Sequence, residues 1–182
     1  MDIFAFYTIY IYKGFKKLDN DIIIIDNFFE DQQYLEKFKE TIDNFPTDGL
    51  WVDVYHKEMY TNHIVEKAGN YFNMKKIKGY EAWTHINSKP SADYEGGWHY
   101  DKDEYRYNLN NILSFPVCSC VFYLQVENLI GGRLIVEDIK ITPRTNRLII
   151  FGPRKKHYVE DFKGTRISIN INPWNRLLEE YT

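Results

Sequence analysis

The chain holds few residues of the kinds that mark secreted or membrane-spanning proteins. Only two of its 182 residues are cysteines, Cys118 and Cys120, with one residue between them. Cysteines so spaced on a strand point to the same side and form no ordinary disulfide, so we expect free thiols in a reducing, cytoplasmic compartment. The apolar start, residues 1–15, lacks a basic region and is too short to span a bilayer, which predicts no targeting segment and no membrane association.

The chain also has no excess of positive charge. Lys and Arg total 23 against 26 Asp and Glu, which gives a net charge of −3, and no long basic run occurs. Proteins that bind duplex nucleic acid neutralise its phosphates with Lys and Arg, so the sequence disfavours a nucleic-acid partner. Alanine is scarce while Ile, Asn, Lys and Tyr are abundant, and this bias predicts an AT-rich source, either viral or a low-GC microbe.

Hydrophobic residues make up 44% of the chain, enough for one folded domain with a real core. We expect an N-terminal strand or arm over residues 1–18 and a single domain over residues 19–182. Apolar residues spaced by three and four predict a helix in EDQQYLEKFKETIDNF that ends near Asn44 and Pro46. A second helix is expected at about residues 60–70.

After residue 75 the pattern changes to short runs rich in Val, Ile, Tyr and Phe, several of them separated by Gly or Pro. Such runs are typical of antiparallel sandwiches and barrels. An Ile-rich strand at DIIIIDNFF comes before the first helix. Helices first and strands later predict an α+β domain in which the helices support one sheet.

Four residues carry a pattern that favours metal chemistry. His99 and Asp101 share a face on an extended segment, so an imidazole and a carboxylate can reach one ion. The run KHYVEDFKGTRIS predicts a hairpin that places His157 opposite Arg166. Two imidazoles and one carboxylate are the protein ligands of mononuclear non-haem Fe(II) sites, and a nearby arginine can hold a dicarboxylate. Taken singly, each residue also fits an ordinary structural role, such as a surface His–Asp pair or a cross-strand ion pair.

The strand that follows Arg166 has one polar and one apolar face. Arg166, Ser168, Asn170 and Asn172 alternate with three isoleucines. The polar face either meets water or lines a pocket, in which case Arg166 with Ser168 would bind a carboxylate. Tyr123 shares a strand face with Ser119 and either reaches the same carboxylate or is a half-buried structural residue.

The order of these motifs resembles a known family. HxD, YLxxxxxxGGxL, PxxNRLIIF, His157, Arg166 nine positions later and then RxS are similar to the Fe(II)- and 2-oxoglutarate-dependent oxygenases, and in particular to their prolyl 4-hydroxylase-like subgroup. The resemblance runs from about Ile22 to about Trp174. It implies a double-stranded β-helix, or jelly roll, with supporting N-terminal helices.

The same resemblance implies the cofactors and the roles of the residues. His99, Asp101 and His157 match the Fe(II) ligands, which are also the catalytic centre. Arg166, Tyr123 and Ser168 match the residues that bind the far carboxylate of the cosubstrate 2-oxoglutarate. The implied reaction consumes O₂ and 2-oxoglutarate, releases succinate and CO₂ and hydroxylates an unactivated C–H, with ascorbate as a candidate reductant.

Several functions stay open at this point. Hydroxylation of a peptidyl proline is the first candidate, followed by a small-molecule or free amino acid hydroxylase. A nucleic-acid demethylase ranks third, since it should show a second arginine soon after Arg166 and a basic face. A zinc hydrolase or a non-catalytic jelly-roll binding module are the alternatives outside the family's chemistry.

Smaller expectations concern the surroundings of the site. The charged segment KDEYRYN predicts a solvated loop or a lid. The other histidines are expected to be structural or on the surface: His56, His63 and His85. Three residues are candidates to orient the ligand histidines: Asp103, Glu104 and Asn146.

Overall fold

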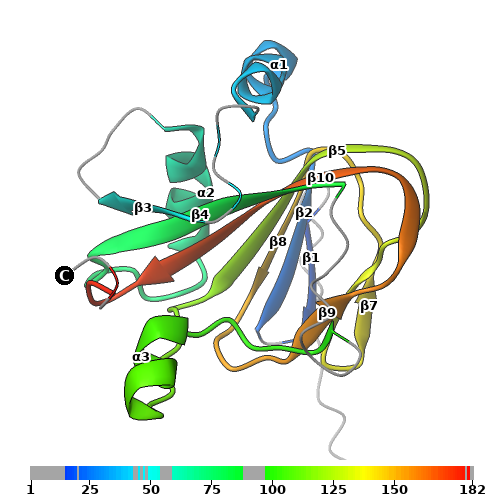
Figure 1. Cartoon of the computed structure of the whole chain (residues 1–182). Helices are drawn as coiled ribbons and strands as arrows, with labels where there is room; N and C mark the ends of the chain where they lie inside the picture. The colour runs from blue at the N-terminus through cyan, green and yellow to red at the C-terminus, as the bar shows by residue number, and fades with distance from the viewer. Residues whose placement is uncertain are drawn as a thin grey trace, which may run out of the picture.

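The computed structural model of the chain describes residues 15–19, 21–42, 45, 47, 49–53, 59–87, 97–178 and 180. The helices in this part of the chain are α1 (Gln32–Glu40), α2 (Tyr60–Ala68) and α3 (Glu104–Asn110). The strands there are β1 (Phe15–Asp19), β2 (Ile22–Asp26), β3 (Leu50–Asp53), β4 (Gly79–Ile86), β5 (Ser119–Gly131), β6 (Leu134–Val136), β7 (Ile139–Ile141), β8 (Arg147–Phe151), β9 (His157–Val159) and β10 (Phe162–Trp174). Figure 1 shows their arrangement, and none of these helices is long and apolar enough to cross a membrane.

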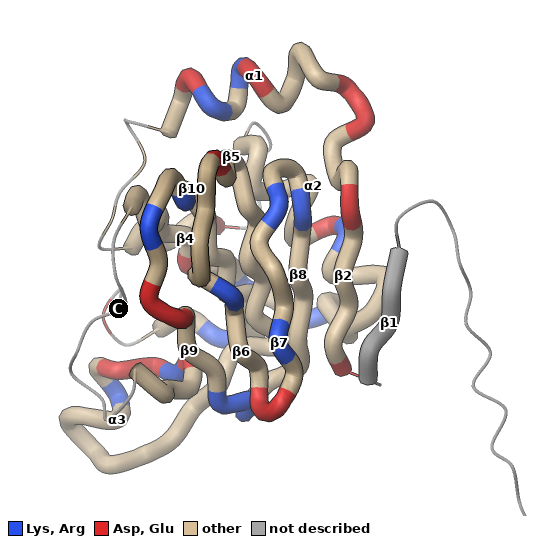
Figure 2. Tube along the Cα trace, turned by 90° about the vertical axis from the view of Figure 1, so that its right-hand side faces the viewer, with Lys and Arg blue, Asp and Glu red and all other residues tan. Residues whose placement is uncertain are grey.

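The strands form two antiparallel sheets. The large sheet has the order β1-β2-β8-β5-β10-β4-β3, and the small sheet has the order β7-β6-β9. From β5 onward the chain passes back and forth, with β5, β8 and β10 in the large sheet and β6, β7 and β9 in the small one. Figure 2 shows the small sheet in front of the large sheet. This is a double-stranded β-helix with helices beside it, which confirms the predicted α+β jelly roll.

Alternation along the strands of the large sheet separates two cores, because successive side chains point to opposite faces. On one face, sheet residues such as Ile23, Phe122 and Ile169 pack with Leu35 of α1 and Ile64 of α2. On the other face, the sheet packs against the small sheet through Ile24, Val121, Tyr123, Ile149, Leu134 and Val136. The helices therefore support the large sheet from outside and leave its inner face to form the interior of the jelly roll.

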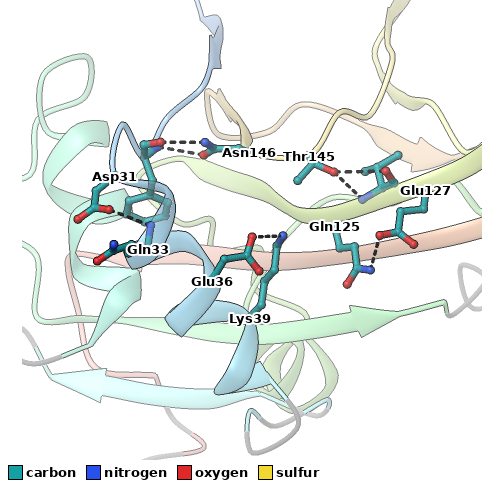
Figure 3. A network of polar contacts seen from close by, with 10 residues as sticks. Asp31, Gln33, Glu36, Lys39, Gln125, Glu127, Thr145 and Asn146 are labelled. Carbon is teal, nitrogen blue, oxygen red and sulfur yellow. Dashed lines mark hydrogen bonds and ion pairs between the residues drawn. The ribbon is translucent and has the colours of Figure 1, made fainter.

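Both predicted N-terminal helices are present. Asp31 caps α1, since its side chain accepts hydrogen bonds from the backbone N–H groups of Gln33 and Tyr34. Leu35 and Phe38 are buried on the face toward the sheet, and Glu36 pairs with Lys39 on the outer face (Figure 3). The helix ends at Glu40 with Thr41 as its C-cap, whereas Asn44 and Pro46, where we expected its end, lie outside the described residues.

Asn146 joins α1 to the sheet and does not orient a ligand histidine, contrary to our expectation. Its side chain donates to the backbone carbonyl of Phe29 and accepts from the N–H of the same residue, both at 2.9 Å (Figure 3). The residue has a φ of +61°, a left-handed conformation that asparagine tolerates better than most residues. Asn146 therefore fixes the segment between β2 and α1 against the start of β8.

The predicted hairpin from His157 to Arg166 is wrong. β9 pairs with β6 in the small sheet, whereas β10 pairs with β5 and β4 in the large sheet. In a jelly roll, consecutive strands can lie in facing sheets, so a short connection crosses the barrel instead of turning back. Gly164, one of the glycines between the apolar runs, forms no turn and lies inside β10 at a register shift, with a φ of +104°.

The segment KDEYRYN, expected to be a solvated loop or a lid, contains most of a helix, so the predicted loop is wrong, while the lid stays a prediction. Asp103 caps α3 by accepting from the N–H of Arg106 at 2.8 Å, and Asn111 ends the helix in a left-handed conformation. No residue of α3 is buried, so the apolar periodicity that predicts a helix is missing here. The short strands β3 and β7 were not predicted either.

The expected boundary between arm and domain, at residues 18 and 19, falls inside β1. This strand pairs with β2 at the edge of the large sheet, with Phe15 opposite Ile25. Residues 1–14 of the expected arm lie outside the described residues.

Candidate metal centre and pocket

Two of the predicted ligands are held together by the backbone. The N–H of His99 donates to the carbonyl of His157 at 3.0 Å, and the N–H of His157 donates to the carbonyl of His99 at 2.9 Å. This isolated antiparallel bridge extends the small sheet by one residue pair beyond β9. The two imidazole rings lie side by side in consequence, with centroids 4.2 Å apart and ring planes tilted by 59°.

Asp101 completes a group of three possible ligands. One ligating atom from each of His99, Asp101 and His157 lies within 4.8 Å of the others. His157 Nε2 is 3.7 Å from Asp101 Oδ1. Since His99 and Asp101 are two residues apart on an extended segment, both side chains reach the same point, as their spacing predicted.

The other ring nitrogen of each histidine meets a backbone carbonyl. His99 Nδ1 lies 2.9 Å from the oxygen of Gly97, and His157 Nδ1 lies 3.1 Å from the oxygen of Lys155. A carbonyl only accepts, so each Nδ1 carries the proton and each Nε2 offers its lone pair to an ion. These carbonyls take the orienting role that we had expected of Asp103 and Glu104.

The protonation state of His157 suits a metal ligand. Burial lowers the pKa of its imidazole, and the negative charge of Asp101 opposes this effect. The neutral imidazole is the form that binds metals, so burial favours the binding form. Two neutral imidazoles and a carboxylate around one point are a donor set that fits Fe(II), and also Zn²⁺.

Arg166, Tyr123 and Ser168 come together beside the ligands. Arg166 is buried, and its Nη1 donates to Ser168 Oγ at 3.3 Å. Its guanidinium lies over the ring of Tyr123, 5.1 Å from the centroid. In the sheet, Ser168 on β10 is the direct partner of Tyr123 on β5, which explains why the three residues share one place.

This group contains polar atoms that lack a partner. The hydroxyl of Tyr123 and Nε of Arg166 are buried, and no described residue forms a hydrogen bond with either atom. Burial raises the pKa of the Tyr123 phenol, and the charge of Arg166 opposes the rise, so Tyr123 is a neutral donor. Buried donors without acceptors are costly, and a bound carboxylate would satisfy both. The arrangement thus fits the far carboxylate of a 2-oxo diacid.

A cavity of about 420 Å³ connects the two groups. His99, Asp101, His157 and Arg166 line it, whereas Tyr123 and Ser168 are fully buried against Arg166 and do not. Asn170 and Asn172 also line the cavity, so the polar face of β10 borders a pocket and does not meet bulk water. The volume is in the range of small-molecule and cofactor sites.

β4 forms one wall of this cavity, which was not predicted, since core packing was the favoured interpretation of Trp83. Glu81, Trp83 and His85 line it from positions directly opposite Asn172, Asn170 and Ser168 of β10. The signal was present, since these residues alternate with Tyr80, Ala82 and Thr84, but the same alternation fits a strand with a face in water. His85 was expected to be structural and instead borders the pocket, while His63 is on the surface as expected and His56 lies outside the described residues.

Two titratable groups on β4 are strongly affected by the pocket. Burial raises the pKa of Glu81 to about 7, a hydrogen bond from Trp174 opposes the rise, and the charge of Asp101 adds to it. Burial lowers the pKa of His85 to about 4, and the charge of Arg166 acts in the same direction. Perturbed groups of this kind gather where ligands bind.

The two cysteines are free and buried, as expected, with their sulfur atoms 3.9 Å apart. Cys120 also borders the cavity.

Comparisons with known proteins agree with this geometry. Residues 85–174, which include every predicted site residue, match the model of the 2OG-Fe(II) oxygenase superfamily. No curated protein sequence matches the chain.

Solved structures give the same fold at low sequence identity. A prolyl-4-hydroxylase from Pseudomonas putida is 15% identical, with a TM-score of 0.57, over 86% of this chain and 93% of that one. A viral collagen prolyl hydroxylase from Paramecium bursaria Chlorella virus-1 is 15% identical, with a TM-score of 0.53, over 90% and 99%. A prolyl hydroxylase from Trichoplax adhaerens, in complex with a peptide fragment of the hypoxia inducible factor oxygen degradation domain, is 16% identical, with a TM-score of 0.56, over 86% and 84%.

Proposed function

We propose that this chain, which belongs to the 2OG-Fe(II) oxygenase superfamily, is a dioxygenase that hydroxylates an unactivated C–H of a peptide, with peptidyl proline as the first candidate. The observation that carries the proposal is one cavity lined both by the cluster His99, Asp101, His157 and by buried Arg166. A metal site alone would also suit a zinc hydrolase. The guanidinium of Arg166 in the same cavity would bind one carboxylate of a dicarboxylate cosubstrate.

Each group of residues has a separate task in this proposal. His99, Asp101 and His157 would hold Fe(II), and the carbonyls of Gly97 and Lys155 keep the imidazoles turned toward it. Arg166, with Tyr123 and Ser168, would bind the far carboxylate of 2-oxoglutarate through charge-assisted hydrogen bonds. When bound, iron with 2-oxoglutarate and O₂ supplies oxidative decarboxylation to succinate and CO₂ and insertion of one oxygen atom into a C–H bond.

Two further observations support a peptide as the substrate. Among proteins of the same fold are prolyl hydroxylases, one of them in complex with a peptide. Beside the cavity, Glu104 at the start of α3 lines the pocket, and α3 and the residues after it expose large apolar side chains. These side chains are Tyr105, Leu109, Ile112 and Leu113, exposed by 47%, 62%, 45% and 53%. Several exposed apolar side chains in one segment are typical of surfaces that bind other chains, and Glu104 connects this segment to the pocket.

The test measures succinate formed from 2-oxoglutarate by protein purified without oxygen, to which Fe(II) and then O₂ are added. We expect turnover in the parent protein, none in His99→Ala, and an increased 2-oxoglutarate requirement in Arg166→Ala. Turnover without the substrate can be too slow to detect. Binding of 2-oxoglutarate in the presence of Fe(II) is therefore measured as well, without O₂. If neither turnover nor Fe(II)-dependent binding is found, the oxygenase function is wrong.

A further inference from the structure

Glu81 is a pocket carboxyl that the proposed chemistry does not use. It lies on β4 and is partly open to the cavity, and Trp174 Nε1 donates to its Oε2 at 2.9 Å. No described residue donates to its other oxygen. Most other charges on the lining have partners, since Lys102 pairs with Glu104 at 2.5 Å and Asp101 lies beside His157. Among the described residues of the lining, Glu81 is therefore an acid without a cation.

Asn172 gives a second and independent sign of an absent ligand. It is the direct cross-strand partner of Glu81, lines the same cavity and has only 3% of its surface exposed. Its Oδ1 atom is buried, and no described residue forms a hydrogen bond with it. A buried acceptor left in this state costs free energy that a donor on a ligand would recover.

Trp83 adds an aromatic surface next to these two acceptors. It follows Glu81 along the pocket face of β4, and its N–H is already used in a hydrogen bond to His85 Nε2 at 3.2 Å. What the indole offers to the cavity is its π system, which attracts cations. A carboxyl, an amide oxygen and an indole ring favour a cationic nitrogen, and they offer nothing to an anion.

We propose that Glu81 and Asn172 form a subsite for a cationic nitrogen of the substrate, the ammonium or guanidinium of a Lys or Arg side chain near the oxidised residue. The subsite lies on the same lining as Arg166, so the cavity has one place for a carboxylate and another for a cation. The 2-oxo diacid and the substrate would each go to the place that complements its charge. Assigning the cation to the oxygenase substrate rests on the proposed function, but the subsite itself does not.

The test compares two peptides that differ in a single charge. Acetyl-Gly-Pro-Lys-Gly-amide and the same peptide with norleucine in place of lysine are titrated calorimetrically into metal-free protein at pH 8. Since a charge-assisted hydrogen bond contributes roughly 1.5–3 kcal/mol, we expect the parent to bind the lysine peptide about tenfold tighter or more. Glu81→Gln should reduce this preference to within about threefold, because the amide still accepts from Trp174 but carries no charge.

Two more variants complete the test. Glu127→Gln, at an exposed position on β5, should keep the full preference for lysine. Asn172→Asp should increase the preference, and it keeps the test decisive if Glu81→Gln fails to fold. Equal affinity of the parent for the two peptides, lack of binding of both, or an unchanged preference in Glu81→Gln would each overturn the subsite. If the parent protein shows the preference for the lysine peptide but no turnover of 2-oxoglutarate, the proposed function is wrong and the subsite is not.

Discussion

His157 Nε2 lies 3.7 Å from Asp101 Oδ1, although the two residues belong to segments that are far apart in the sequence. The backbone bridge between His99 and His157 brings these segments together, and Asp101 follows two residues later on the same face. At this distance one divalent cation between the two side chains would replace a weak contact with two coordination bonds.

Replacing Asp101 by Ala should therefore weaken Co(II) binding, used as a spectroscopic substitute for Fe(II), by more than about 100-fold, since even residues that only orient ligands cost 10–100-fold. Titration of the visible absorption of Co(II) measures the affinity. Asp138→Ala removes an exposed carboxylate at the end of the β6–β7 turn and serves as the matched control. Equal Co(II) affinity in the two variants would remove Asp101 from the site.

Tyr123→Phe should have effects of opposite sign on stability and on cosubstrate binding. The hydroxyl is buried without a hydrogen-bond partner among the described residues, so its removal should leave the free energy of unfolding unchanged or raise it by up to about 1 kcal/mol. The same change removes a donor to the cosubstrate and should weaken 2-oxoglutarate binding roughly 5- to 20-fold. Urea unfolding and Fe(II)-dependent 2-oxoglutarate titration measure the two effects, and a clear loss of stability would contradict the unpartnered state.

His85 should make the metal-free protein less stable in mild acid. Its pKa is lowered to about 4 in the folded protein by burial, while the unfolded chain binds the proton near 6.5. Above pH 6.5 both states are neutral, and the penalty grows as the pH falls from 6.5 to about 4. Its full size is roughly 3 kcal/mol. The gap in unfolding free energy between His85→Gln and the parent should widen over this range in favour of the variant, and a constant gap would show that His85 titrates normally.

The pair of Asp103 and Arg176 should stabilise the C-terminal side of the pocket. Asp103 is 3% exposed, pairs with Arg176 through Oδ2 and caps α3 through Oδ1. Asp103→Asn keeps the cap but leaves Arg176 without its partner, which should cost about 1–3 kcal/mol because Arg176 is partly exposed. Asp103→Ala loses the cap as well, for about 1 kcal/mol more. Thermal and urea unfolding of both variants give the comparison, and equal stabilities would show that the cap contributes nothing.

The exposed apolar side chains of α3 and of the residues after it should affect binding of the peptide and not of the cosubstrate. Leu109→Asp and Leu113→Asp place charges on a surface where the parent exposes leucines, so both should raise the KM for a peptide substrate several-fold. Their free energies of unfolding should stay within about 0.5 kcal/mol of the parent, as is usual for surface changes. Steady-state kinetics with varied peptide and varied 2-oxoglutarate separate the two effects. An unchanged peptide KM would place the substrate on another side of the cavity.

The parts of the site that could be predicted are those determined by residues close together in the sequence. The two-residue spacing of His99 and Asp101 and the alternation along β10 follow directly from the geometry of extended chains. Both hold in the structure, where one cavity is lined by His99, Asp101, Arg166, Asn170 and Asn172. Most of the strands, though not β3 and β7, and the two supporting helices were likewise visible as periods of two and of three to four.

The parts that failed depend on which elements meet in space. The run from His157 to Arg166 fits two strands joined by a short connection, and no local pattern tells a hairpin from a crossing between sheets. Glu81 and His85 alternate as strictly as the residues of β10, but only the pairing of β4 with β10 places them in the cavity. α3 buries no residue, so its sequence lacks the apolar periodicity from which the helix could be predicted.

The backbone bridge between His99 and His157 also determines when the metal site forms. Two of the three proposed ligands are positioned by backbone hydrogen bonds of the fold. The chain entropy lost in ordering these ligands is therefore lost when the protein folds and not when the metal binds. We expect the apoprotein to keep its sheets when a chelator takes the metal, and to bind metal again at a rate set by diffusion and dehydration of the ion. The iron would then be an exchangeable part of a protein that is already folded when the metal arrives.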